Sequence, residues 1–249
     1  MYEEHPSFPQ PENVNAKIWR YMDFTKFIDM LRTGGLFFSR ADKLGDPFEG
    51  SWPSINARGW RDHASRMEAL ALADNREFDQ SAEVLSRAFR SFTKYKGVNC
   101  WHMSEVESDA MWKLYLKSNE GIAIQTRYEL LRDSFSSVEE TIFLGKIRYL
   151  NYETEHFRSD NLCNPYMHKR LGFQHEREIR ALLIRYPESH RDPVGSGVLI
   201  PVKLSKLVEA VYVAPFCGDW VKDNVEEVIK RFGYKFHVVR SSFEKPPDF

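Results

Sequence analysis

Three groups of polar residues have types and spacings that suit chemistry on a charged ligand. They are an early arginine, a serine beside an arginine, and a late pair of glutamates followed by an arginine: Arg20; Ser39 and Arg40; Glu176, Glu178 and Arg180. Alternate side chains of a β-strand share a face, so a strand over residues 176–184 would point Glu176, Glu178 and Arg180 the same way. Charges on a central strand are costly to bury unless they are paired or used, whereas an exposed Arg–Glu ladder is a purely structural alternative.

The order of these residues along the chain suggests how they would divide the chemistry. Arg20 would hold the diphosphate of a dinucleotide, because a guanidinium makes paired hydrogen bonds to phosphate oxygens. Ser39 would position the ribose that carries nicotinamide, and Glu178 would stabilise a cationic transition state at that ribose. This order resembles that of the Arg-Ser-Glu type of ADP-ribosyltransferase, and the resemblance implies NAD as the substrate.

The loop of residues 41–50 (ADKLGDPFEG) is a second candidate, since it carries two aspartates, a glutamate, a proline and two glycines. The proline pushes Asp46 out of the α region and favours a turn. The loop is either a tight connection or a binding loop that presents Asp46 and Glu49. Together with Glu176 and Glu178, these carboxylates would suit a hydrolase or nuclease that uses a divalent metal ion.

The densest run of unusual residues is 99–115 (NCWHMSEVESDAMWKLY). Ser104 and Glu107 have the spacing of a capping box, which predicts that a helix begins there and runs to about residue 117. A short strand before this helix would place Trp101 and His102 at the wall of a site. A buried corner with a hydrogen-bonded histidine is the structural alternative.

Cysteine usage indicates a reducing environment. Cys100, Cys163 and Cys217 are far apart in the sequence and include no CxxC pair, so neither a disulfide framework nor a cysteine-rich zinc site is supported. The setting expected from this is cytoplasmic. Cys100 and His102 would share a strand face, and a Cys–His hydrolase is therefore one more alternative to a structural cysteine.

The composition is that of a globular chain without a strong electrostatic preference. Of its 249 residues, 42% are hydrophobic and 29% are charged, and the formal net charge is -1. No global basic field points to nucleic acid, although a local patch is compatible with it. No apolar run approaches membrane-spanning length, and the N-terminal segment is not a signal peptide. The familiar signatures GxxxxGK[ST], GxGxxG, GxSxG and HExxH are absent.

Hydrophobic periodicity predicts a single α+β domain over residues 1–249, with a mixed, mostly antiparallel sheet and packed helices. Strands are expected at 17–22, 36–40, 98–102, 121–126, 142–151, 176–184, 198–204, 208–214 and 234–240. Helices are expected at 23–31, 60–73, 78–92, 128–135 and 218–232, the last of them closing a βαβ-like unit with the strands around it. Residues 1–15 would form an extended N-terminal arm, and residues 55–97 a helical insertion beside or over the site.

From about Trp19 onward the chain resembles a bacterial family known only as a domain of unknown function, numbered twenty-nine seventy-one. Short blocks of residues carry the resemblance: 19–22, 36–42, 46–50, 100–102, 107–108, 111–112, 121–124, and Phe173 with Glu176, Glu178 and Arg180. The resemblance implies a bacterial or phage protein, sometimes found near mobile or defence genes, and no established reaction.

The leading hypothesis is a nucleotide-handling enzyme, most concretely one that transfers ADP-ribose from NAD in a bacterial defence or toxin system. Glu178, Glu176 and His102 are the expected catalytic residues. The expected substrate-binding residues come from five segments: Arg20, Ser39, Arg40, Asp46, Glu49, Trp101 and Arg180. The acceptor would be a nucleic acid or a protein. The metal-dependent hydrolase or nuclease and a non-enzymatic binding module of a defence system remain the alternatives, and the oligomeric state is open.

Overall fold

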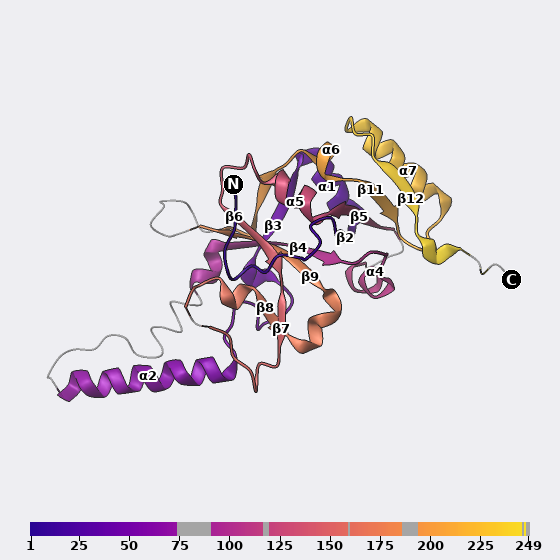
Figure 1. Ribbon diagram of the computed structural model, residues 1–249. Coiled ribbons are helices and arrows are strands. Elements are labelled where there is room, and N and C mark those ends of the chain that lie inside the picture. The colour runs from indigo at the N-terminus through magenta and orange to yellow at the C-terminus, as the bar shows by residue number, and fades with distance from the viewer. Residues whose placement is uncertain (74–90, 117–119, 159, 186–193, 246, 248–249) are drawn as a thin grey trace.

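The computed structural model describes residues 1–73, 91–116, 120–158, 160–185, 194–245 and 247 (Figure 1). Ten strands form the main sheet. Eight of them follow one another across it: β1 (Tyr2–Glu3), β6 (Ile142–Lys146), β9 (Glu178–Ile184), β4 (Lys96–Met103), β2 (Lys17–Asp23), β5 (Gly121–Arg127), β11 (Ala210–Val213) and β12 (His237–Arg240). The other two, β3 (Gly35–Arg40) and β10 (Gly197–Pro201), form a branch that joins the sheet at β4. A second sheet pairs β7 (Arg148–Leu150) with β8 (His168–Arg170).

Most neighbouring strands of the main sheet are antiparallel, and β1–β6 and β11–β12 are its parallel pairs. The expected α+β class with a mixed, mostly antiparallel sheet is therefore confirmed. A parallel pair needs a crossover connection, and α7 (Asp219–Arg231) supplies it between β11 and β12. This is the βαβ-like closure that the spacing predicts.

Both faces of the sheet are covered. One face packs against α1 (Phe24–Thr33), α5 (Tyr128–Ser134), α6 (Leu204–Leu207) and α7, which together bury the largest apolar cluster. The opposite face is covered by α4 (Asp109–Tyr115), by the 3-10 helix Asn164–Tyr166 and by the N-terminal residues. The strand β9 contributes to both layers: Ile179, Ala181 and Leu183 point to the first and Leu182 and Ile184 to the second. Burial on both faces explains its continuous apolar sequence.

The sheet opens at β4, because β2 and β3 pair with opposite ends of that strand on the same side. Ile18 and Trp19 of β2 pair with Met103 and His102, whereas Ser39 and Arg40 of β3 pair with Val98 and Gly97. Between these two ladders the side chain of Asn99 donates a hydrogen bond to the carbonyl oxygen of Phe37 at 3.0 Å. The divergence of β2 from β3 leaves a gap in the middle of the sheet, where a ladder would otherwise continue.

The helix α1 shows how local sequence sets the edge of this gap. It begins after Asp23, buries Phe27, Met30 and Leu31 on one side, and ends at Gly34. Gly34 adopts the left-handed conformation with φ of 64°, which a residue without a side chain adopts at little cost. The chain then reverses directly into β3, so α1 lies beside the gap between its two flanking strands.

The structure corrects the expected start of the helix after β4. The capping residue is Ser108, whose side chain accepts a hydrogen bond from the Met111 amide, and α4 ends at Tyr115. Ser104 and Glu107 do not form a capping box. Glu107 is instead buried, accepts a hydrogen bond from the indole of Trp112, and ties the chain to Ser242 near the C-terminus.

Several expected strands also differ: the strand expected at 198–204 ends at Pro201, and the strand expected at 234–240 begins at His237. The expected strand 142–151 is split into β6 and β7, which belong to different sheets. The expected strand over 176–184 begins only at Glu178, because Leu171–Glu176 forms a 3-10 helix that ends at Arg177 in the left-handed conformation, with φ of 41°. Glu178 and Arg180 share a strand face as expected, whereas Glu176 reaches the same neighbourhood from the turn before the strand.

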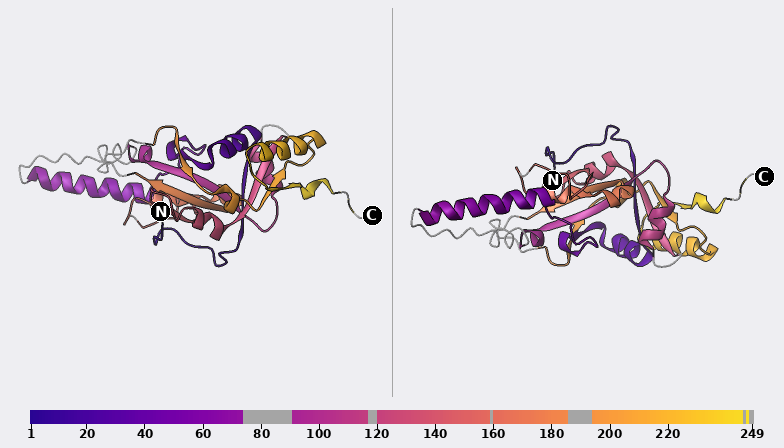
Figure 2. Two further views of the ribbon diagram at one scale, coloured as in Figure 1. Left: turned by 90° about the horizontal axis from the view of Figure 1, so that it is seen from above. Right: turned by 90° about the horizontal axis from the view of Figure 1, so that it is seen from below.

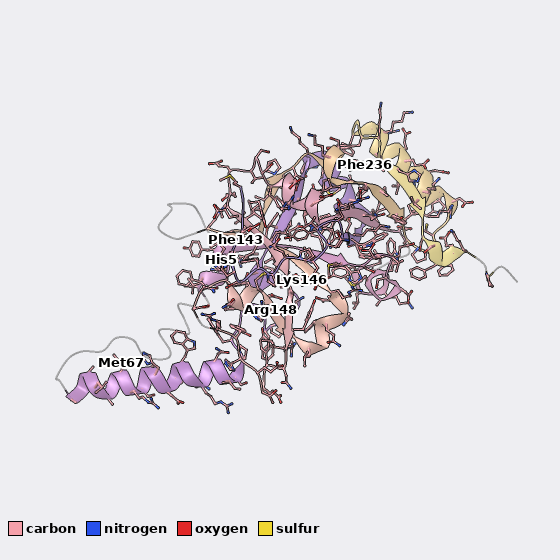
Figure 3. All side chains as sticks on the ribbon, in the orientation of Figure 1. His5, Met67, Phe143, Lys146, Arg148 and Phe236 are labelled. Carbon is pink, nitrogen blue, oxygen red and sulfur yellow. The ribbon has the colours of Figure 1, made fainter. Side chains whose placement is uncertain are left out.

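The N-terminal residues and α2 (Ser54–Ala73) lie at the periphery. The N-terminal segment runs along β6, where the backbone amide of Lys146 donates to the Pro9 carbonyl at 2.8 Å. The rings of His5 and Phe143 lie 5.6 Å apart (Figure 3). The helix α2, which includes Met67, projects away from the sheet in both views of Figure 2. The expected helix 60–73 lies within α2, and most of the expected helix 78–92 lies outside the described residues. The division into a domain with an insertion stays a prediction. No helix of the described chain has the length and apolar character needed to cross a membrane.

Candidate active site in the gap between two strands

A cavity of about 530 Å³ occupies the gap between β2 and β3. Its volume lies in the range of roughly 300–1,000 Å³ that is typical of small-molecule sites. Polar or aromatic side chains from six segments line it, among them Arg20 and Tyr21, Thr25, Lys26 and Asp29, Ser39, Trp101 and His102, Tyr115, and Glu176 and Glu178. Strand alternation points Arg20 and Trp101 to the face of the sheet that α1 covers. It points His102 and Glu178 to the opposite face of the sheet. Because both sets line one cavity, the cavity passes through the sheet.

Arg20 is a buried cation on the α1 side of the cavity, where the exposed Lys26 pairs with Asp23 instead. Its guanidinium lies 5.9 Å from the ring centre of Trp101, and Nη2 donates to the carbonyl oxygen of Phe37 at 3.4 Å. Nη1 is shielded from solvent and has no hydrogen-bond partner in the described part of the chain. Burial lowers the pKa of Arg20, but an arginine remains charged at neutral pH. A guanidinium that has an unused donor and, among the described residues, no carboxylate partner is suited to an anionic ligand.

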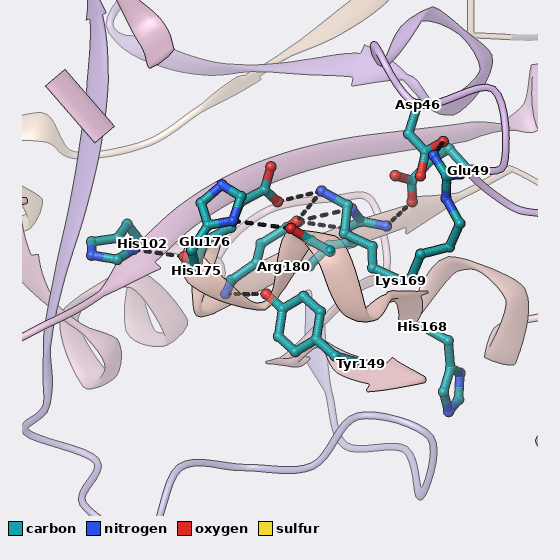
Figure 4. Close-up of polar contacts among 12 residues, drawn as sticks. Asp46, Glu49, His102, Tyr149, His168, Lys169, His175, Glu176 and Arg180 are labelled. Atoms are coloured by element: carbon teal, nitrogen blue, oxygen red, sulfur yellow. Dashed lines mark hydrogen bonds and ion pairs between the residues drawn. The ribbon is translucent and has the colours of Figure 1, made fainter. Parts of the chain in front are cut away.

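On the opposite side of the cavity, Glu176 and Glu178 line the wall and belong to an ionic cluster of five residues. The other three members, Glu49, Lys169 and Arg180, lie behind the wall (Figure 4). Lys169 Nζ lies 2.5 Å from the carboxylate of Glu176 and 2.9 Å from that of Glu178. Arg180 donates to Glu178 through Nε at 2.6 Å and Nη2 at 3.1 Å, and it also contacts Glu49. Three carboxylates and two cations leave one net negative charge when all five are ionised.

The cluster fixes the protonation of Glu178. Burial alone would raise the pKa of this carboxylate, but Arg180 and Lys169 outweigh burial and hold the pKa at about 2. The same burial would lower the pKa of Lys169, and the nearby Glu178 raises it instead. The pKa of Glu49, which does not line the cavity, is raised by burial despite Arg180. Glu178 is therefore an ionised carboxylate at the cavity wall at any physiological pH.

Six of the ten residues singled out in the sequence line this cavity, and four do not. Arg40 pairs with Asp42 at 2.6 Å, and Asp46 pairs with Arg170 at 2.8 Å. Glu49 and Arg180 lie behind the wall, where they contact each other and, in the case of Arg180, hold Glu178. Whether the six lining residues act in binding or catalysis stays a prediction. No residue of α2 contributes to this cavity.

Sequence reasoning missed Lys169, Tyr21 and Tyr115. Lys169 comes from β8 of the small sheet, and its HKR context has no periodicity or motif that marks it out. Tyr21 accepts a hydrogen bond from the Ser108 amide at 2.9 Å, and burial raises its pKa. Aromatic content is the only signal for the tyrosines, and it does not separate a cavity wall from a core.

The geometry weighs against two alternative chemistries. Burial raises the pKa of Cys100, which keeps its thiol protonated and a poor nucleophile at neutral pH. The four carboxylates proposed to hold a divalent metal are each paired with a cation: Asp46 with Arg170, Glu49 with Arg180, Glu176 with Lys169, and Glu178 with both Lys169 and Arg180. Within the described chain, no cluster of three or more acidic, histidine or cysteine residues has the geometry of a metal site.

Three solved structures of DarT from Thermus sp. 2.9 are similar to this chain. The complex with NAD+ has a TM-score of 0.43 and 11% identity, covering 95% of this chain and 100% of that chain. The complexes with ADP-ribosylated ssDNA and with carba-NAD+ have TM-scores of 0.41 and 10% identity, covering 96% and 93% of this chain and 99% and 96% of those chains. At this level the likeness assigns no ligand or residue role. No protein-family model and no curated protein matches the chain, so the resemblance to the domain-of-unknown-function family is not confirmed.

Proposed function

We propose that the protein binds NAD in the cavity between β2 and β3 and transfers its ADP-ribosyl group to an acceptor. One observation supports this most directly: Arg20, with a buried and unused Nη1 donor, and the ionised Glu178 line the same cavity. A cationic group suited to a diphosphate and a fixed negative charge suited to a cationic ribose are the two requirements of this reaction. Ser39 is half-buried at the same wall and would contact the ribose.

In the proposed reaction the bond between C1′ of the ribose and the nicotinamide nitrogen breaks. Its electron pair goes to the positively charged nicotinamide ring, which leaves as a neutral molecule. Positive charge then develops at C1′ and the ring oxygen, where the carboxylate of Glu178 stabilises it. The pKa of about 2 keeps this carboxylate ionised without any change of protonation during the reaction.

Lys169 and Arg180 would hold the Glu178 carboxylate in place. Its two oxygens are both occupied, Oε1 by Arg180 Nε and Oε2 by Lys169 Nζ, and the side chain is only 3% exposed. The net negative charge of the cluster remains available to the cavity, because Glu176 adds a carboxylate on the same side. A fixed charge costs little reorganisation when the transition state forms, which favours catalysis.

The acceptor is proposed to be a nucleic acid or a protein, and a role in a bacterial defence or toxin system rests on the sequence resemblance alone. Acceptors are best compared in parallel: a single-stranded oligodeoxynucleotide, an unrelated folded protein and the protein itself. Single-stranded DNA belongs in this set because one of the DarT structures contains ADP-ribosylated ssDNA. Labelled NAD reports both nicotinamide release and transfer.

The decisive comparison is between Glu178→Gln and Glu49→Gln. Each removes one buried carboxylate from Arg180, but only Glu178 lines the cavity. Both variants should lose stability, because a buried cation loses a partner. Glu178→Gln should also lower NAD cleavage by at least about 100-fold, the scale of one lost electrostatic contact. Glu49→Gln should retain cleavage, and Glu176→Gln should lose less than Glu178→Gln. Equal effects from Glu178→Gln and Glu49→Gln would contradict the assignment of Glu178.

A ligand test separates the transferase from the alternatives. NAD should raise the melting temperature of the wild-type protein, because a ligand that binds only the folded state stabilises it. Stabilisation by Mg²⁺ or Mn²⁺ with no response to NAD would favour the hydrolase instead. No response to any of them, together with no nicotinamide release, would favour a non-enzymatic binding module.

A further inference from the structure

His102 is a buried histidine in which one ring nitrogen is hydrogen-bonded to the backbone and the other has no hydrogen-bond partner in the described chain. Its Nδ1 lies 2.6 Å from the carbonyl oxygen of Glu176. A carbonyl oxygen only accepts hydrogen bonds, so Nδ1 carries the proton and Nε2 of the neutral ring carries a lone pair. Nε2 has no hydrogen-bond partner in the described chain, although His102 is only 3% exposed and lines the cavity.

The fold places His102 next to the proposed catalytic residue Glu178 in the sheet. His102 and Glu178 are direct partners in the antiparallel ladder between β4 and β9, so their side chains leave the sheet on the same face. Tyr21 lies edge-on to His102 on the other side, with ring centres 6.3 Å apart. The imidazole is thus held between two cavity-lining side chains, and rotation of the ring would break the bond to the Glu176 carbonyl.

We infer that His102 Nε2 is the base that takes the proton from the acceptor group as that group attacks C1′ of the ribose. In this step the acceptor's X–H bond breaks, the proton goes to Nε2, and a bond forms between X and C1′. The C1′–N bond breaks in the same process, and its electron pair leaves with nicotinamide. The imidazolium then returns its proton to solvent. This role rests on the proposed function, and it requires an acceptor with an ionisable N–H or O–H group.

The surroundings of His102 keep it neutral and able to accept a proton at pH 7. Burial lowers its pKa below the ordinary value of 6.5, the charges of Arg177 and His175 lower it further, and the Glu176 carbonyl opposes them. The titratable or charged groups next to it are Tyr21 from β2, Glu178 from β9, and His175, Glu176 and Arg177 from the turn before β9. Cys100 of its own strand and Tyr115 of α4 line the same cavity. Burial raises the pKa values of Tyr21, Cys100 and Tyr115, and Glu178 ionises far lower.

The matched test uses His102→Asn and His102→Gln. An asparagine amide places an N–H group near the position of Nδ1 and retains the bond to the Glu176 carbonyl, but it removes Nε2. A glutamine amide reaches the position of Nε2 without being able to take a proton at neutral pH. Both variants should lose transfer by roughly 10²- to 10⁴-fold, the usual contribution of a general base, with the dissociation constant for NAD changed less than about twofold.

The pH profile gives a readout that a structural role would not move. Wild-type transfer from labelled NAD, measured between pH 5 and 9 with the three acceptors and with water alone, should rise with pH as His102 loses its proton. This acid limb should disappear in His102→Asn. A limb that persists in His102→Asn, or a wild-type profile without a limb, would overturn the base role. If His102→Asn does not fold, the wild-type profile and His102→Gln decide. A wild-type protein that releases no nicotinamide from NAD would instead contradict the proposed function itself.

Discussion

Replacing Lys169 with methionine would remove the cation that bridges two cavity-lining carboxylates. Lys169 Nζ lies 2.5 Å from Glu176 and 2.9 Å from Glu178, and its side chain is 10% exposed. Methionine retains an unbranched apolar stem of similar length, so the substitution tests the charge more than the packing. The cluster would then carry three carboxylates against Arg180 alone, which doubles its net negative charge.

The expected loss of stability follows from burial. Breaking a buried ion pair by removing one partner costs about 3–5 kcal/mol, because the other charge stays buried. At about 3 kcal/mol, the melting temperature should fall by roughly 6–12 °C for a domain of this size. The matched control is Lys113→Met, since Lys113 pairs with Asp109 at 2.6 Å but both side chains are more than half exposed. Loss of such a surface pair costs at most about 1 kcal/mol.

The loss should also depend on pH in a defined direction. The folded-state pKa of Glu178 is about 2, below its ordinary value of 4.5, so its interactions stabilise the protein above pH 4.5 and are lost as the pH falls through 2. Removing Lys169 should raise this pKa by about 1–3 units. The free energy of unfolding of Lys169→Met should therefore lie furthest below wild type at pH 7, and the difference should shrink as the pH falls from the raised pKa of the variant toward 2.

Urea unfolding followed by circular dichroism at pH 7, 5 and 3.5 measures this difference directly. The reasoning fails if Lys169→Met loses no more stability than Lys113→Met at pH 7. It also fails if the difference in unfolding free energy between the variant and wild type is the same at all three pH values, because Lys169 would then not affect the pKa of Glu178.

Three further results are expected. Ser108→Ala should cost about 1 kcal/mol of stability, because Ser108 accepts the hydrogen bond from the Met111 amide. Ser104→Ala should cost almost nothing. Urea unfolding of the two variants measures both losses, and equal losses would contradict the assignment of Ser108 as the capping residue. Arg20→Met should abolish stabilisation by NAD in a thermal melt while leaving the apo protein no less stable, since it removes a buried, unsatisfied donor. None of the three thiols should react with iodoacetamide in the folded protein at pH 7, because burial raises the pKa of Cys100, Cys163 and Cys217. Modification of any of them in the folded protein, detected by mass spectrometry, would refute this prediction.

The sequence by itself determined the elements whose signals are local. The helix α1 has its apolar side at 3.6-residue spacing and is followed by a glycine at the position that needs a left-handed backbone, and both are properties of eleven adjacent residues. The α+β class followed in the same way, and so did the crossover of α7 between β11 and β12. The alternation within β9 also placed Glu178 and Arg180 on one face.

Local sequence signals predict the wrong secondary structure where a contact with a residue distant in the sequence stabilises another conformation. Ser104 and Glu107 have the spacing of a capping box, but Glu107 is engaged by Trp112 and Ser242, and Ser108 caps the helix instead. The run 176–184 reads as one strand, yet Glu176 is held in a 3-10 turn by a carbonyl bond to His102 and a side-chain contact to Lys169. In both cases tertiary hydrogen bonds outweigh a weak local preference.

The cavity itself was decided only by the tertiary structure. It exists because β2 and β3 pair with opposite ends of β4, and register between distant strands leaves no periodic pattern in either of them. The ionic cluster likewise joins Glu49, Lys169 and Arg180 from three separated segments. Residue types alone could suggest Arg20 and Glu178 as functional residues. Only the packing of the sheet brings them to one cavity from opposite faces, because it fixes where the strands separate.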